Sequence, residues 1–483
     1  MRSTWLALCV ALAVMHAGCG GASRATLPAP HRPLVRTRDD ASRAPPPLAT
    51  LPLLEVPEVH RTTLATGLDV QVVPRTELPL VAIVVASRAF HIHDPGSPRG
   101  AASLTARVME RELGRMALAA RGRELAAPDV TAGGDGLLIA MQVPSTEVVP
   151  ALTMLSAVLR AEDCFAADVE LARVAHRELV ARAQTVGRLA SLGALVSLYG
   201  PEDPRSAPSY GSALHVERLQ RAHCIAQRRR GLLPASTTIA IAGDITPEEA
   251  FAHVQGTLGA WARTGAAVPP APPPTFPQSE RNLLLVPVRS EEGSLMIVER
   301  GPGPDEPGFP AFAVLTRMLG GMFAARMNIE VRERRGWAYG VSAELGVAAD
   351  HSTVRVECTV RGDRLLDTLQ VFEHELWRLR EPARIEADEL ATAVSMERAT
   401  LRTQLEARTS VAYALARAFL HGRTLADHAR LDAALASLRS DDVARAAASF
   451  RLGAAPVVMI GPRELAPALA RARPGRFGLI LPP

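Results

Sequence analysis

The stretch Val-Arg-Glu-Arg-Arg-Gly-Trp-Ala-Tyr-Gly occupies residues 331–340, and Leu-Gly-Gly precedes it at 319–321. The corresponding place in the first half of the chain reads Gly-Ala-Ala-Ser-Leu-Thr-Ala-Arg (100–107). The first stretch carries a guanidinium and a phenol, which can both donate hydrogen bonds to carbonyl oxygens and to a developing oxyanion. The second contains neither histidine nor a carboxylate. The two places therefore support different chemistry.

The two halves of the chain repeat one pattern. At a constant offset, Glu170-Leu171-Ala172 faces Glu389-Leu390-Ala391. Further on, the apolar run at 238–243 faces a similar run at 457–461. We therefore expect a duplication with two homologous halves.

Hydrophobic patterning predicts the elements of each half. The run at 80–85 is apolar throughout, as expected of a strand that is buried on both faces. The other expected elements of the first half are strands at 67–73, 136–143 and 238–242, and helices at 101–120, 145–159, 166–185 and 189–198. Strands at both ends with several helices packed on one face predict an α+β fold. It consists of two homologous α/β sandwich domains, each an antiparallel-rich sheet covered by helices.

The N-terminus has the features of an export signal. Arg2 precedes an apolar run at 5–14, which is too short for a retained membrane-spanning helix. The following Ala17-Gly18-Cys19 resembles a bacterial lipobox, although His16 stands where an aliphatic residue is usual. We expect an exported protein of the bacterial cell envelope, on the periplasmic side, with a lipid on Cys19 as its membrane anchor. A plain exported protein is the alternative.

Composition sets the boundaries of the segments. Residues 20–57 are rich in Pro, Ala and Arg, which is typical of a flexible tether, and the proline-rich run at 269–274 cannot continue a helix or a central strand. The expected segments are a signal peptide at 1–19, the tether at 20–57, an N-terminal domain at 58–264, a linker at 265–281 and a C-terminal domain at 282–483.

The overall composition is that of a globular protein of 483 residues, which suits two domains of roughly 200 residues each. The net charge of +4 rests entirely on arginine, because the chain contains no lysine. Aromatic residues make up only 4% of the chain, so platforms for stacking nucleic-acid bases are lacking and we expect no nucleic-acid partner. Beyond the N-terminal segment, Cys164 and Cys224 could pair in an oxidising compartment; buried free thiols, Cys358 included, are the alternative.

The order of elements and motifs resembles the insulinase/pitrilysin family of zinc peptidases, and within it the mitochondrial-processing-peptidase-like branch. The resemblance covers about residues 58–480. It rests on Gly67-Leu68, Pro79, 100–102 and 243–249 in the first half, and on 319–321, Arg326, Arg332-Glu333 and 336–339 in the second. It implies that the two sandwich domains form one half of a clamshell around a closed chamber.

Active members of that family hold zinc through an inverted His-x-x-Glu-His motif on one helix and a glutamate on a later helix. The matching positions here hold Ser103 and Arg107 in place of the histidines and Ala106 in place of the general base. Alanine has no proton to exchange, and arginine puts a fixed positive charge where the dication would sit. The resemblance therefore implies a degenerate zinc motif, with no metal and no cofactor in this chain.

Glu178 matches the later zinc ligand of the family. Without the other ligands, we expect a solvated or arginine-paired carboxylate, with Arg107 as one candidate partner. Two other places have partial metal-binding patterns: His91 and His93 share one side of an extended segment, and His374-Glu375 begins a zinc motif that Arg378 interrupts. We interpret both as ordinary surface residues.

Arg332 and Tyr339 match the pair that binds the substrate backbone and the scissile carbonyl in the family. A surface ion pair and a tyrosine that caps a strand are the alternative interpretation. Gly320 and Gly321 match a bend near the chamber wall of the family, and they also suit a plain helix C-cap.

The resemblance implies a catalytically incompetent subunit. We expect it to pair with a zinc-bearing paralogue as a heterodimer, to bind an unfolded peptide as an added strand, and to supply Arg332 and Tyr339 to the partner's active site. Zinc is expected only in the partner. A non-enzymatic pseudopeptidase that binds peptides or braces an envelope complex is the alternative, and an active peptidase with an unrecognised metal site is a third.

Overall fold

The computed structural model describes residues 51–90, 97–120, 128–183, 186–206, 208, 210–262, 273–276, 281–451 and 453–480. The predicted signal peptide with Cys19, most of the tether, His91 and His93, and most of the linker lie outside these residues. No helix in the described ranges is long and apolar enough to cross a membrane.

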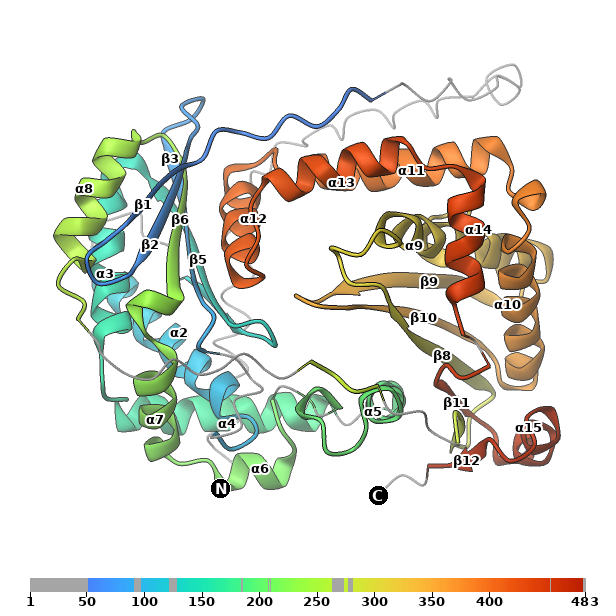
Figure 1. The fold of residues 1–483 in the computed structure, drawn as a ribbon. Helices are drawn as coiled ribbons and strands as arrows, with labels where there is room; N and C mark the ends of the chain where they lie inside the picture. Colours follow the sequence, from blue (N-terminus) through green and yellow to red (C-terminus); the bar gives the residue numbers. More distant parts are fainter. Residues whose placement is uncertain are drawn as a thin grey trace, which may run out of the picture. The chain divides into compact units, whose positions relative to one another are not determined.

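Two six-stranded sheets form the framework (Figure 1). The first has the strand order β1-β2-β6-β3-β5-β4 and the second has the order β12-β7-β11-β8-β10-β9. The strands of the first sheet are β1 (His60–Thr63), β2 (Asp69–Pro74), β3 (Leu80–Ser87), β4 (Asp129–Ala132), β5 (Leu137–Pro144) and β6 (Thr237–Gly243). Those of the second are β7 (Leu283–Pro287), β8 (Glu292–Gly301), β9 (Ala338–Val347), β10 (Ser352–Arg361), β11 (Val457–Gly461) and β12 (Phe477–Leu479).

The two sheets share one topology from their second strand onward. β2 pairs in parallel with β6 in the first sheet, and β7 pairs in parallel with β11 in the second. The neighbouring pairs β6–β3, β3–β5 and β5–β4 are antiparallel, and so are β11–β8, β8–β10 and β10–β9. The sheets differ at one edge, where β1 is antiparallel to β2 and β12 is parallel to β7. The α+β prediction of two homologous sandwiches is confirmed.

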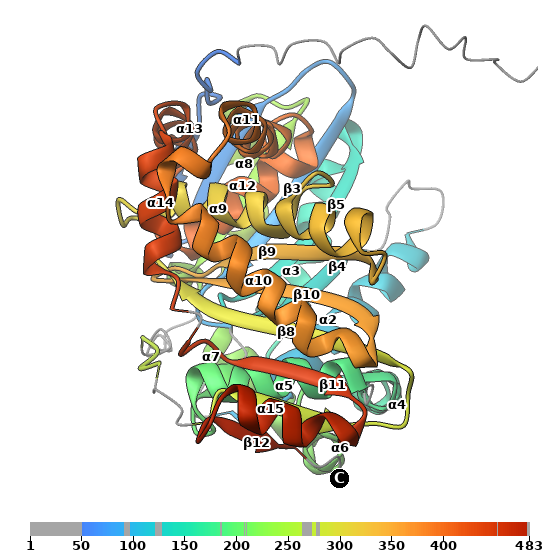
Figure 2. The same ribbon diagram turned by 90° about the vertical axis from the view of Figure 1, so that its right-hand side faces the viewer.

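Each sheet is covered on one face by helices of its own half. In the first half these include α2 (Ala101–Ala119), α3 (Val148–Arg160) and α8 (Pro247–Leu258), which pack on residues such as Ile83, Val85 and Ile241. In the second they include α9 (Phe309–Thr316), α10 (Leu365–Leu379) and α14 (Ser440–Ser449). Figure 2 shows α9 and α10 in front of the second sheet. The remaining helices are α4 (Ala166–Ala183), α6 (Ala213–Arg218), α7 (Arg221–Gly231), α11 (Ala387–Thr403), α13 (Ala426–Ala436) and α15 (Ala466–Ala472).

The opposite face of each sheet is covered by a helix from the other half. α12 (Arg408–Leu420) packs on β3 and β6, and α5 (Val186–Tyr199) packs on β8 and β11 (Figure 1). Small side chains such as Ala82, Ala86 and Ala240 let α12 approach its sheet closely. The expectation of helices on one face only was therefore wrong. A strand buried on both faces needs a second covering layer, which each half obtains from the other.

The segment before β1 is tied to the second half by a buried carboxylate. Asp432 of α13 is fully buried and accepts a hydrogen bond from the backbone N–H of Leu54 at 2.8 Å. Arg398 donates to both oxygens of Asp432, at 2.9 and 3.0 Å, and to the carbonyl of Pro52 at 2.7 Å. Arg402 donates to the same carboxylate at 2.8 Å. The network joins α11, α13 and the N-terminal segment.

We expect the stability that Asp432 contributes to disappear between about pH 4 and pH 2. Burial by itself would raise the pKa of Asp432, but the hydrogen bonds from Arg398, Arg402 and Leu54 outweigh it and lower the pKa to about 2. A folded-state pKa below the unfolded one stabilises at pH values above the unfolded pKa, and this contribution is lost as pH falls through the folded value. Asp432→Asn should cost about 2 kcal/mol at neutral pH, and the difference from wild type should shrink toward pH 2. Urea unfolding of both proteins across this range measures it; a constant difference would refute the assignment.

Candidate functional site

The predicted zinc-motif positions lie on α2. Ala106 is 2% exposed and packs in the core between α2 and the first sheet. Ser103 and Arg107, one turn apart, are half-buried. Neither carries an imidazole, and Ala106 offers only a methyl group to the core.

The helix that should carry the remaining ligand, α4, presents a different residue to the interior. Glu178 has a side chain that is 63% exposed and forms an ion pair with Arg182 at 3.6 Å. Arg107, its other candidate partner, forms no ion pair with a carboxylate in the described part of the chain. His176, two residues earlier, lies about half a turn away on the buried face of the helix.

His176 is a titratable residue that α4 buries, as is Asp168, which pairs with Arg115 of α2 at 2.5 Å. Its Nε2 lies 2.7 Å from the carbonyl oxygen of Tyr210, whereas its Nδ1 is buried without a hydrogen-bond partner. Burial lowers the pKa of His176 and the nearby charge of Arg107 lowers it further, against the raising effect of the Tyr210 carbonyl. The imidazole is therefore neutral at neutral pH, and its Nε2–H donates to Tyr210.

The described residues contain no group of three or more histidine, cysteine, aspartate or glutamate side chains that could hold a metal ion. His374 stacks on Trp377, with 6.2 Å between the ring centroids. Glu375 is buried and pairs with Arg378 at 3.0 Å, so it serves the packing of α10. The charge of Arg107 further opposes a dication beside α2.

Arg332 and Tyr339 form an exposed cluster with an aromatic residue that the sequence analysis missed. The guanidinium carbon of Arg332 lies 4.3 Å from the ring centroid of Phe323 and 5.7 Å from that of Tyr339. Tyr339 is 95% exposed and Phe323 is 72% exposed, which is unusual for side chains of this size. Arg332 also contacts Glu333, with 3.3 Å between Nε and Oε1. The cation thus contacts two aromatic rings that are open to solvent.

The strand that carries Tyr339 is held in place by its neighbours. Asn328 donates to the carbonyl of Val341 at 3.1 Å and accepts from its N–H at 2.7 Å. Gly320 and Gly321 end a π-helical turn that packs directly on β9. A Cβ on Gly320 would come within 3.1 Å of the Cβ of Ala343, and one on Gly321 within 3.1 Å of its carbonyl oxygen. Neither glycine adopts the left-handed conformation of a C-cap. The close approach of this turn to β9 therefore explains why both positions hold glycine.

The cluster opens into a pocket of about 1180 Å³. Its wall combines Arg332, Tyr339 and Phe323 with polar residues of β10, including Arg355 and Glu357. The first half of the chain contributes Ser191, Leu192 and Leu195 of α5, together with Pro208 and Tyr210. The carbonyl of Tyr210 accepts from His176 of α4, and α4 packs on α2, which carries the degenerate motif. Tyr210 therefore links the pocket to these two helices. Sequence reasoning missed Phe323 and Tyr210; the position of Phe323 two residues after Gly321 was the only local signal.

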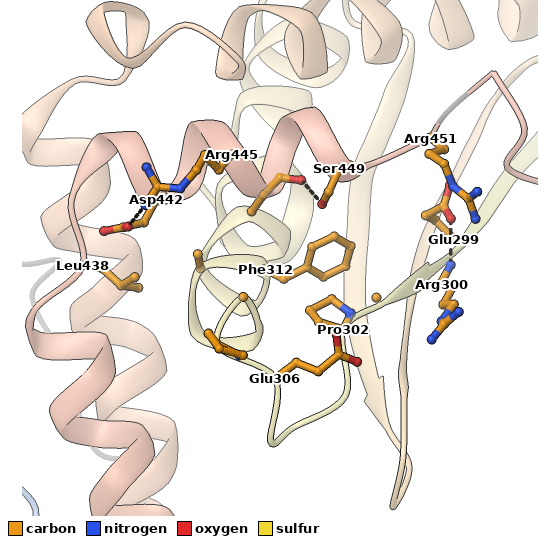
Figure 3. A pocket seen from close by; sticks show the side chains of 15 residues that line it. Glu299, Arg300, Pro302, Glu306, Phe312, Leu438, Asp442, Arg445, Ser449 and Arg451 are labelled. Atoms are coloured by element: carbon orange, nitrogen blue, oxygen red, sulfur yellow. Dashed lines mark hydrogen bonds and ion pairs between the residues drawn. The ribbon is translucent and has the colours of Figure 1, made fainter. Parts of the chain in front are cut away.

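A second pocket, of about 590 Å³, lies between the end of β8, α9 and α14 (Figure 3). Glu299 is buried there, accepts from the N–H of Arg300 at 3.1 Å, and has a pKa raised by burial and opposed by Arg451. Its charged walls balance: Arg300, Arg445 and Arg451 face Glu299, Glu306 and Asp442. The formal charges that line the pocket are equal in number, so they favour neither an anion nor a cation.

Residues 230–396 match the family model described as the peptidase M16 inactive domain. The chain is 27% identical over 215 residues to an uncharacterised zinc protease of Mycobacterium leprae, covering 44% of this chain and 48% of that protein. It is 29% identical over 210 residues to an uncharacterised zinc protease of Mycobacterium tuberculosis, covering 43% and 48%. The matched region thus spans about half the length of these relatives.

Two solved structures have the same fold. A peptidase M16 inactive domain from Pseudomonas fluorescens is similar with a TM-score of 0.75 and 21% identity, covering 84% of this chain and 98% of that one. The first half of the periplasmic protease PqqL from Escherichia coli is similar with a TM-score of 0.66 and 14% identity, covering 87% and 95%. The predicted family resemblance is confirmed, whereas the mitochondrial-processing-peptidase-like branch stays a prediction.

Proposed function

We propose that the chain is a catalytically degenerate member of the peptidase M16 family and that it supplies a substrate-binding surface to a separate zinc-bearing paralogue. The two would form a heterodimer that hydrolyses unfolded peptides. Arg332 and Tyr339 would donate hydrogen bonds to the backbone carbonyls of the peptide. The partner would provide the zinc and the general base.

One contrast carries this proposal. The motif positions on α2 hold serine, alanine and arginine, whereas Arg332 and Tyr339 lie together on an open pocket. An exposed tyrosine and phenylalanine beside a guanidinium contribute little to the fold, because their surfaces stay in water. Such a cluster suits contact with another molecule, since aromatic residues and arginine dominate binding hot spots.

A non-enzymatic role is the second candidate, and the same cluster favours it. Phe323 and Tyr339 offer apolar surface that could hold an extended peptide without any cleavage. The two candidates differ in whether a zinc-bearing partner gains activity from this chain.

The purified chain should contain no stoichiometric zinc and should show no peptidase activity alone. Because Ser103, Ala106 and Arg107 offer no ligand set, a chelator should leave its thermal midpoint unchanged. Mixing it with its most similar paralogue that bears an intact zinc motif should activate that paralogue. Metal analysis and a fluorogenic peptide assay measure this, with the paralogue alone as the control. Bound zinc or activity in the isolated chain would overturn the proposal, and inertness of the mixture would favour the scaffold.

We also propose that the chain is exported and anchored to the cell envelope through a lipid on Cys19. The pattern that supports this is Arg2, the apolar run at 5–14 and Ala17-Gly18-Cys19. Labelled fatty acid should be incorporated into the wild type and not into Cys19→Ala. Incorporation that persists in the variant would contradict the proposal.

A further inference from the structure

Two buried thiols face each other beside the motif helix. Cys164 lies two residues before α4, and Cys224 lies in the middle of α7. Both side chains are fully buried and both thiols are free. They belong to one apolar cluster with Leu104 and Val108 of α2.

Hydrogen bonds on both sides of Cys224 hold α7 against the segment that carries Cys164. Arg221 donates from Nε to the carbonyl of Cys164 at 2.7 Å, and Arg228 donates from Nη1 to the carbonyl of Asp163 at 3.1 Å. Positions 221, 224 and 228 lie on one face of a helix. The face that contacts the Cys164 segment is therefore the face that presents Cys224.

The two thiols lie within hydrogen-bonding range of each other, and the thiol of Cys164 donates to the sulfur of Cys224. Thr105 of α2 lies beside them, with its hydroxyl donating to the carbonyl of Ala101 at 2.7 Å. In the folded chain the bond from Cys164 lowers the pKa of Cys224 against the raising effect of burial, and Arg228 lowers it further. The bond to Cys224 and burial raise the pKa of Cys164.

We propose that Cys164 and Cys224 form a disulfide bond when the chain folds in an oxidising compartment. Two main-chain anchors fix the two segments, and both thiols lie in one buried cluster within hydrogen-bonding range of each other. The bond would link the segment before α4 to α7, and both helices pack on α2. It closes a long loop that includes α4, α5 and α6, so it stabilises by restricting the unfolded chain.

The reaction needs an oxidant that itself carries a disulfide, such as oxidised glutathione or a protein disulfide. The thiolate of one cysteine attacks one sulfur of that disulfide and releases the other as a thiolate. The second cysteine then loses its proton and attacks the sulfur of the first, which releases the second oxidant sulfur. Two protons and two electrons leave the cysteine pair, and the disulfide of the oxidant becomes two thiols. Because both sulfurs are buried in the folded chain, the bond forms before α7 has docked.

Peptide mapping of the purified full chain tests this directly. The chain is refolded in oxidised glutathione, treated with an alkylating agent in denaturant and cleaved by trypsin, which cuts only after arginine because lysine is absent. We expect peptides 161–173 and 222–228 to appear as one linked species that reductant separates. Peptide 356–361, with Cys358, should appear singly and alkylated. Recovery of all three peptides singly alkylated would overturn the proposal.

Thermal unfolding gives a second readout. Reduction should lower the midpoint of the wild type by several degrees. It should leave Cys224→Ser unchanged, with Cys164→Ala as the substitute if that variant does not fold. The matched control is Cys358→Ser, which removes a buried thiol with a pKa raised by burial to about 12 and should keep the full shift. If reductant leaves the thermal midpoint of the wild type unchanged, the proposed disulfide is contradicted. Neither readout involves a partner or peptidase activity, so the result is independent of the proposed function.

Discussion

Arg332→Ala should lower kcat/KM of the reconstituted pair about 10²- to 10³-fold, the usual effect of removing one preorganised donor to a developing oxyanion. Tyr339→Phe, which removes only a hydroxyl, should cost about tenfold or more. In the described residues the hydroxyl of Tyr339 has no hydrogen-bond partner, so its loss leaves the fold unchanged. Steady-state kinetics on a peptide substrate measure both values.

The matched control is Arg334→Ala. Arg334 lies two residues along the same turn and pairs with Glu330, and its side chain is 65% exposed outside the Arg332 pocket. Its removal should change kcat/KM less than twofold, because its exposed side chain lies outside the pocket and the buried Glu330 keeps Arg335 as a partner. Equal losses in Arg332→Ala and Arg334→Ala would mean that general destabilisation, and no contact with substrate, explains the effect. A loss in kcat at unchanged KM would place the contact in the transition state.

Glu112→Ala should destabilise the folded chain by about 3–5 kcal/mol. Arg228 of α7 is fully buried and pairs with Glu112 of α2, which is itself nearly buried. Without Glu112, the guanidinium loses a carboxylate partner while it stays buried. Urea unfolding monitored by circular dichroism measures the loss.

Glu178→Ala is the control for that experiment. It also removes a glutamate that pairs with an arginine in the first half, but its side chain is 63% exposed. We expect less than about 0.5 kcal/mol. A large effect here would show that Glu178 has a structural or metal-binding role that its position on α4 does not suggest.

The sequence predicted most of the framework. Helices expected at 101–120 and 145–159 are α2 (Ala101–Ala119) and α3 (Val148–Arg160), and the strand expected at 80–85 extends to Ser87. Apolar periodicity is a local property, so it survives without tertiary information. The short edge strands β1 and β4 were missed because each has only four residues and gives a weak pattern.

α7 was missed for a different reason. Its sequence, Arg-Ala-His-Cys-Ile-Ala-Gln-Arg-Arg-Arg-Gly, has no apolar stripe, and its docking depends on Arg221 and Arg228 bonding to the Asp163-Cys164 segment. Partners more than fifty residues away cannot be found by a local pattern. His176 and Glu178 show the same limit, since the phase of α4 against α2 decides which of them is buried.

The sequence by itself determined what α2 cannot do, because the absence of imidazole and carboxylate at Ser103, Ala106 and Arg107 is a matter of residue identity. It also determined the duplicated order of strands and helices. Only the tertiary structure decided that α5 and α12 cover each other's sheets, that Phe323 joins Arg332 and Tyr339, and that Cys164 meets Cys224. Each of these depends on contacts between distant residues, and their geometry is fixed by how the packed layers fit together.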